Sequence, residues 1–272
     1  MMFTVDGHAA YCYTGGRAFD AALPTIAFIH GAQNDHSVWG LQSRYMAHHG
    51  HNVLAVDLPG HGRSAGPALA SVEAMAAWLL AVLDAAGVGA ALLVGHSMGS
   101  LIALDAARQA PAGVRALAML GTTYPMVVSP ALLETARDDE ARAIDMVAIW
   151  SHSTLAPKPS APGPGFSTMG GARRLMQRMS ARNPDHLFHT DFSACNAYAN
   201  GDAAAASLAC PVLFIFGTLD MMTPARSTKR LTAAVAHARI VHVAAGHALM
   251  QEQPDAVLDA LVAFAAAPSS TK

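Results

Sequence analysis

The segment GHSMG at residues 95–99 constrains this chain more than any other part of its sequence. It follows the apolar, strand-like residues 91–94 and precedes the helix-like residues 98–110. A serine on a tight turn from a strand into a helix needs neighbours with almost no side chain, and the flanking glycines meet that need. The pattern predicts a strand–turn–helix unit that lifts the Ser97 hydroxyl clear of the backbone, where it can act as a nucleophile.

Short apolar runs alternate with amphipathic segments along most of the chain. The runs contain β-branched residues, as buried strands do, and the segments between them repeat apolar residues at helical spacing. We predict strands at residues 25–30, 52–58, 91–94, 114–120, 212–216 and 240–243, and helices at residues 37–48, 71–86, 98–110, 223–236 and 255–267. This alternation is typical of a parallel sheet with helices on both faces.

The middle of the chain breaks this alternation. Residues 123–206 contain helix-like stretches, at 129–150, 171–181 and in part of 185–206, but no convincing buried strand. The Pro- and Gly-rich residues 157–165 form either an entrance loop or an exposed linker. We predict a core domain made of residues 1–122 and 207–272, with residues 123–206 inserted as a helical cap or lid over the active site.

Two further residues stand at the ends of predicted strands. Asp220 follows the run 212–216, and His247 follows the run 240–243. Chemistry in open α/β sheets gathers at the carboxyl ends of the strands, so both side chains are expected near Ser97. The chain order serine, acid, histidine is one known order of the catalytic triad. Asp220 alone is equally well explained as a loop or capping residue, and His247 alone is better explained as a surface loop histidine, but the three residues together predict a triad.

Backbone N–H groups complete the predicted site. The loop after residues 25–30 offers the N–H of Ala32, and the residue after the serine offers the N–H of Met98, so these two form a candidate oxyanion hole. His30 is predicted to be structural, and Asp57 and His61 to fix the loop that follows residues 52–58.

These residues carry a resemblance to a known family. The chain resembles the α/β-hydrolase superfamily over nearly its whole length, in the form of a serine esterase with a helical cap. The motifs that carry it are His30-Gly31, DLPGHGRS at residues 57–64, GHSMG at 95–99, FGTLD at 216–220 and Gly246-His247. The resemblance implies an α/β-hydrolase fold with an eight-stranded, mostly parallel sheet flanked by helices, and it implies no metal and no organic cofactor.

The resemblance also implies a mechanism. Ser97 attacks a carbonyl carbon and forms an acyl-serine, His247 takes and returns the proton, Asp220 holds His247, and water releases the acid. Epoxide hydrolases and haloalkane dehalogenases of this fold use an aspartate nucleophile, so Ser97 disfavours both. The hydrolases of meta-cleavage products, which cut carbon–carbon bonds, often carry Asn before the serine and Trp after the histidine. This chain has His96 and Ala248 there, which weakens that alternative.

The expected substrate is a carboxylic ester, thioester or lactone of small to medium apolar character. Carbon–carbon cleavage, acyl transfer, perhydrolysis and a non-enzymatic ligand-binding role stay open as alternatives. Methionines are frequent in the predicted cap and after Asp220, and their flexible side chains suit an apolar pocket as well as a core. Candidate pocket residues are Met146, Trp150, Met221 and Ala248.

Composition narrows the partners. The net charge is −2, and 13% of the residues are charged, about half the usual share, so we expect neither a nucleic acid nor a membrane as partner. The chain starts without a basic region followed by an apolar run, and its three scattered cysteines form no metal motif, so we expect a cytoplasmic protein. The 14 histidines include no His-Glu-x-x-His motif. A homodimer is one option for its assembly.

Overall fold

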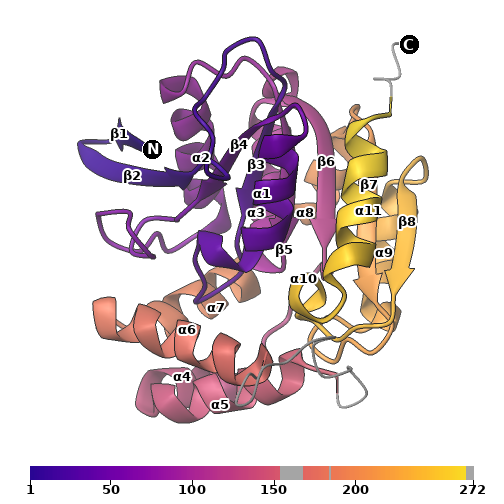
Figure 1. Cartoon of the computed structure of the whole chain (residues 1–272). Helices are drawn as coiled ribbons and strands as arrows, with labels where there is room; N and C mark the ends of the chain where they lie inside the picture. Colours follow the sequence, from indigo (N-terminus) through magenta and orange to yellow (C-terminus); the bar gives the residue numbers. More distant parts are fainter. Residues whose placement is uncertain (154–167, 184, 268–272) are drawn as a thin grey trace.

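An eight-stranded sheet forms the centre of the protein (Figure 1). The computed structural model describes residues 1–153, 168–183 and 185–267. The strands are β1 Met2–Val5, β2 His8–Tyr13, β3 Thr25–Ile29, β4 Asn52–Val56, β5 Ala91–His96, β6 Val114–Leu120, β7 Val212–Gly217 and β8 Arg239–Val243. They are ordered β1-β2-β4-β3-β5-β6-β7-β8. Strands β3 to β8 run parallel, whereas β1 and β2 pair antiparallel. The predicted eight-stranded, mostly parallel sheet is confirmed.

Helices cover both faces of the sheet, as the alternating sequence predicts. Side chains of one strand point alternately to the two faces, so Ile26 and Phe28 of β3 belong to one hydrophobic cluster, and Ala27 and Ile29 to another. The first cluster lies under α1 Gly40–His48 and α11 Pro254–Ala265. The second lies under α2 Val72–Ala85, α3 Met98–Gln109 and α9 Ala225–Ala234. The central strands β3 to β7 are therefore buried on both faces of the sheet. No helix in the described part of the chain has the length and apolar character to span a membrane.

Between β6 and β7, the described residues form five helices. They are α4 Pro130–Asp138, α5 Glu140–Ser151, α6 Thr168–Arg182, α7 Leu187–Ala197 and α8 Gly201–Ser207. Figure 1 shows α4 to α7 gathered beyond the carboxyl ends of the parallel strands, while α8 packs against α3 and α9 of the core. The stretch predicted as one helix is two, because Asp139 ends α4 and its side chain accepts the N–H of Arg142 in α5. The predicted loop at residues 157–165 lies outside the described residues.

The turn between β5 and α3 is built as the GHSMG segment requires. Ser97 has a φ of 53° and a ψ of −120°, a left-handed conformation that costs energy for a residue with a Cβ atom. A Cβ atom at Gly95 would overlap the carbonyl oxygen of Gly99, and one at Gly99 would lie 2.6 Å from the carbonyl oxygen of His30. The two glycines let the backbones of β3, β5 and α3 approach one another, and this approach holds Ser97 in its turn.

Replacing Gly95 with alanine is expected to lower the free energy of unfolding by about 2–4 kcal/mol, because the new methyl group has no space beside the backbone of Gly99. Gly89→Ala is the matched control, since a Cβ atom there meets nothing within 4 Å. Urea unfolding of the two variants measures the difference. Equal stabilities would contradict the proposed close packing.

Candidate active site

The three side chains of the predicted triad meet at the carboxyl edge of the sheet. Ser97 follows β5, Asp220 follows β7 and His247 follows β8. Strands β7 and β8 are neighbours, and β6 lies between β5 and β7. The Nδ1 atom of His247 lies 2.9 Å from the Oδ2 atom of Asp220, and both residues are buried. Ser97 and His247 line the same two cavities. Within the described residues, the Ser97 hydroxyl forms no hydrogen bond with His247; such contacts are often longer before substrate binds.

Asp220 is held as an ionised acceptor. Its Oδ1 atom accepts the backbone N–H groups of Met222 and Thr223, each at 2.8 Å, and the Thr223 hydroxyl donates to Oδ2 at 2.7 Å. Burial alone would raise the pKa of this carboxyl group, but the charge of the His247 imidazolium and these hydrogen bonds outweigh burial and lower the pKa well below its usual range. The carboxylate can therefore hold the His247 Nδ1–H and leave Nε2 free to act as a base.

Thr223 binds the carboxylate of Asp220 and does not cap a helix. The helix predicted over residues 223–236 begins at Ala225, with Pro224 as its N-cap. The hydroxyl and N–H of Thr223 instead bind Asp220. A short polar side chain three residues after the carboxylate suits either role, so the sequence alone did not distinguish them.

His96 is hydrogen-bonded to the loop that carries His247. Its Nε2 atom lies 2.9 Å from the backbone oxygen of His247 and donates a hydrogen bond to it, and the two rings lie 4.7 Å apart. Burial, together with the nearby charge of His247, lowers the pKa of His96 to about 3, so its imidazole is neutral. Gly121 lies against the ring of His247, since a Cβ atom at position 121 would lie 3.2 Å from Nδ1 of His247. Sequence reasoning gave neither residue a place in the site.

The predicted oxyanion donors border the reactive serine. Met98 is the first residue of α3, so its N–H has no partner within the helix and lies at the positive end of the helix dipole. Ala32 lines both cavities with Ser97. The side chain of Asn34 donates to the backbone oxygen of Ala32 at 2.9 Å and so fixes the loop. Gly31 lets this loop pass close to the turn, since a Cβ atom there would lie 3.2 Å from Cβ of Ser97.

The histidine loop is tied to helix α5. The carboxylate of Glu252 accepts the N–H of Gly246 and the N–H of Ser153, each at 2.9 Å. The N–H of Ala248 donates to the backbone oxygen of Ser151 at 2.9 Å. The end of α5 and the loop that carries His247 therefore form one connected unit over the site.

A second tie joins the oxyanion loop to the inserted helices. Asp191 of α7 accepts the N–H of Gln33 at 2.7 Å and lies 2.9 Å from Nε2 of His61, and all three residues are buried. The Gln33 side chain donates to the Ser180 hydroxyl of α6 at 2.7 Å. Burial disfavours a charged His61, but the Asp191 carboxylate outweighs burial and raises the pKa of His61. His61, predicted to fix a loop, thus also binds α7.

Two cavities reach Ser97. The smaller has a volume of about 60 Å³ and the larger about 190 Å³, and both include Ala32, Phe192 and Met222 in their walls. Of the predicted pocket residues, Trp150 and Met221 line the larger cavity and Ala248 lines the smaller. Met146 is not among the described residues of either wall; it is partly buried against the hydrophobic core. The remaining wall of the larger cavity has more apolar than polar residues and comes from residues 126–129, Leu132, Cys195 and Thr223.

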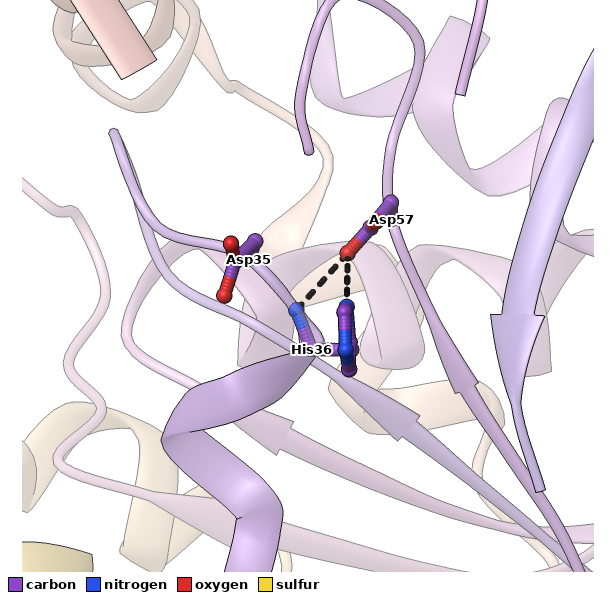
Figure 2. A group of neighbouring side chains, drawn as sticks. All are labelled: Asp35, His36 and Asp57. Atoms are coloured by element: carbon purple, nitrogen blue, oxygen red, sulfur yellow. Dashed lines mark hydrogen bonds and ion pairs between the residues drawn. The ribbon is translucent and has the colours of Figure 1, made fainter. Parts of the chain in front are cut away.

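Three side chains of the kinds that bind metals lie beside this site, and their hydrogen bonds hold two loops in place. Asp35, His36 and Asp57 place ligand atoms within 4.8 Å of one another. Figure 2 shows that the Oδ1 atom of Asp57 is bonded to the N–H of His36, at 2.8 Å, and to its Nδ1 atom, at 2.7 Å. The other oxygen of Asp57 accepts the N–H of Arg63 at 2.8 Å, and Arg178 binds Asp35 at 3.0 Å. N–H donors thus occupy these carboxylates, and the cluster fixes the loops after β3 and β4.

Comparison with known proteins identifies relatives of the whole chain. A family model described as the alpha/beta hydrolase fold matches residues 24–254. The curated "Putative carbamate hydrolase RutD" of Klebsiella pneumoniae subsp. pneumoniae is 28% identical over 240 residues, which cover 83% of this chain and 85% of that protein. The crystal structure of the enol-lactonase from Burkholderia xenovorans LB400 matches with a TM-score of 0.84 and 22% identity, over 98% of this chain and all (100%) of that one. A thermophilic esterase gives 0.80 and 24%, over 97% and 96%. These structures share the fold.

The buried histidines near the site predict a loss of stability in acid. Burial, with the nearby charge of His61, lowers the pKa of His30 to about 4, and His96 behaves similarly. An unfolded chain binds these protons near pH 6.5, so between about pH 6.5 and 4 the unfolded state holds more protons than the folded state. Each histidine should then lower the free energy of unfolding by up to about 1.4 kcal/mol per pH unit as the pH falls.

Urea unfolding of the wild type and His30→Gln between pH 7 and pH 4.5 measures this effect. In the variant, the free energy of unfolding should depend less steeply on pH, by about the contribution of one histidine. His61 does not obscure the comparison, because its raised pKa adds stability that is complete below pH 6.5 and is lost only as the pH rises further. Identical slopes in the two proteins would show that His30 is not buried in its neutral form.

Proposed function

The chain belongs to the α/β-hydrolase fold family, and we propose that it is a serine hydrolase that cleaves a carboxylic ester, thioester or lactone through an acyl-serine intermediate. The observation that carries the proposal is the 2.9 Å contact between His247 Nδ1 and Asp220 Oδ2 beside a serine held in a left-handed turn. A carboxylate fixes the imidazole with its proton on Nδ1, and a left-handed turn projects the hydroxyl toward the cavities.

The reaction follows from these positions. The Ser97 hydroxyl oxygen attacks the carbonyl carbon while His247 Nε2 takes its proton, and the carbonyl oxygen becomes an oxyanion that accepts the N–H groups of Ala32 and Met98. His247 then returns the proton to the leaving oxygen or sulfur, and the acyl group stays on Ser97. Water, activated by the same imidazole, releases the acid and restores the hydroxyl. Asp220 stays ionised and stabilises the imidazolium in both halves.

The cavities support a substrate of limited size. The larger cavity, about 190 Å³ and lined by more apolar than polar residues, suits a small to medium apolar group. Trp150 and Met221, two of the candidate pocket residues, contribute to its wall. Esterase and enol-lactonase neighbours of the same fold agree with this reaction class by analogy. We further propose that helices α4 to α7 act as the cap. A cytoplasmic location, the lack of a cofactor and assembly as a homodimer stay predictions.

Carbamate cleavage is the second candidate. A relative that matches most of the chain carries this function in its name, and a carbamate carbonyl would use the same nucleophile and oxyanion donors. Carbon–carbon cleavage is less well supported, because His96 and Ala248 occupy the positions discussed above. Acyl transfer and perhydrolysis share the acyl-serine, and rates measured with added alcohol or peroxide distinguish them from hydrolysis.

A panel of nitrophenyl esters and thioesters of increasing acyl length tests the proposal. We expect the highest kcat/KM on short and medium chains, and a loss of at least about a hundredfold in Ser97→Ala, because the covalent route is removed. Ser207→Ala is the matched control, since Ser207 is exposed on α8 and its hydroxyl bonds only the backbone oxygen of Ala204. A Ser97→Ala enzyme with near wild-type activity would refute the serine mechanism.

A further inference from the structure

Two buried imidazole nitrogens in the smaller cavity's walls have no partner. They are Nδ1 of His96 and Nε2 of His152, and neither has a hydrogen-bond partner among the described residues. The two residues are 6% and 9% exposed. Both line the cavity of about 60 Å³ together with Ser97 and His247. Buried polar atoms in folded proteins are nearly always paired, so two unpaired nitrogens beside the reactive serine point to a ligand that pairs with them.

The chemistry of each unpaired nitrogen is fixed by the other nitrogen of its ring. His96 Nε2 donates to the backbone oxygen of His247 at 2.9 Å, and His152 Nδ1 donates to the backbone oxygen of Ala148 at 2.8 Å. A carbonyl oxygen can only accept, so each of these nitrogens carries the hydrogen. In a neutral imidazole the second nitrogen then offers a lone pair. Two residues that line the cavity therefore each hold a buried hydrogen-bond acceptor without a partner among the described residues.

The position and lining of the cavity narrow the ligand further. A Cβ atom at Gly31 would lie 3.1 Å from His96 Nδ1 and 3.2 Å from Cβ of Ser97, so the lone pair of His96 and the reactive serine face the same glycine. The described wall of the cavity contains no Asp, Glu, Lys or Arg. A positively charged group would lack a countercharge there, so a neutral donor suits the site better.

We propose that the smaller cavity is a subsite for a small, neutral, hydrogen-bond-donating group of the substrate, such as a hydroxyl, a carboxamide or a carbamoyl N–H, which donates to His96 and His152. The substrate then has two unlike ends, since the larger cavity takes an apolar group while the smaller takes the donor. This inference rests on the proposed serine hydrolase function and names the class of substrate that it acts on. His96 and His152 are specificity-determining residues in this account.

Matched pairs of esters test the subsite. Ethyl glycolate and ethyl propionate differ on the acyl side by a hydroxyl in place of a methyl group, and 2-hydroxyethyl butyrate and propyl butyrate differ likewise on the alcohol side. For each pair we take the ratio of kcat/KM for the hydroxyl ester to kcat/KM for the methyl ester. The measured quantity is the double ratio, which is this ratio for the wild type divided by the same ratio for His152→Phe. Division by the variant removes the intrinsic reactivity of the esters. His152→Phe keeps an aromatic ring and removes the acceptor nitrogen.

We expect this double ratio to reach about tenfold in one of the two pairs, because a buried acceptor left without its donor disfavours the analogue that lacks the hydroxyl. His49→Phe is the matched control, since His49 is exposed and stacks on Tyr45, and its double ratio should be close to one. A double ratio below about threefold for His152→Phe in both pairs would overturn the subsite, and a larger one in either pair supports it. Hydrolysis of ethyl propionate that is lost in Ser97→Ala tests the serine mechanism separately.

A spectroscopic measurement covers the case in which His152→Phe does not fold. In Ser97→Ala protein with ¹⁵N-labelled histidine, the assigned signals of His96 Nδ1 and His152 Nε2 should have lone-pair chemical shifts. The hydroxyl ester of the preferred pair should move both signals, and its methyl counterpart should leave them in place. Signals that respond equally to both esters would overturn the proposal.

Discussion

The backbone at Ser97 turns with a φ of 53° between a buried strand and a buried helix, and only the absence of side chains at Gly95 and Gly99 permits it. The carbonyl groups that would collide with a Cβ atom belong to β3 and to α3 itself, so the turn depends on the close packing of the central strands. The turn also places the serine and the first N–H of α3 at the same edge of the sheet. A left-handed serine is strained, and the surrounding packing must hold it.

The residues around this turn are held from both sides by the inserted helices. Glu252 and Ser151 join the His247 loop to α5, while Asp191 and Gln33 join the oxyanion loop to α6 and α7. The loop that carries His247 and the loop that carries Ala32 are thus fixed by the same group of helices. The geometry of the site therefore depends on the inserted helices as well as on the sheet. The buried carboxylates of Glu252 and Asp191 join those helices to the two loops.

Strands β3 to β7 could be predicted because each is an apolar run with nearly all its residues buried. The edge strand β8 is mostly exposed, but its short β-branched run could still be recognised. The chain order of Ser97, Asp220 and His247 could be predicted because each residue follows one of these strands. Strands β1 and β2 were missed, since they mix exposed and buried residues at the sheet edge. Asp6-Gly7, both with positive φ, was the one turn signal that pointed to their hairpin. The partners His61 and Asp191, 130 residues apart, and the unpaired nitrogens of His96 and His152 could not be predicted, because they depend on how distant segments pack.

In the proposed mechanism, Ser97 carries the acyl group. Reaction of the wild type with a fluorophosphonate, followed by mass spectrometry of the intact protein and of its peptides, tests it most directly, because the reagent reports an activated serine whatever the natural substrate. The mechanism predicts one adduct, on the peptide that contains Ser97, with loss of activity, and no adduct in Ser97→Ala. An unmodified wild-type protein, or an adduct on a different serine that abolishes activity, would contradict it.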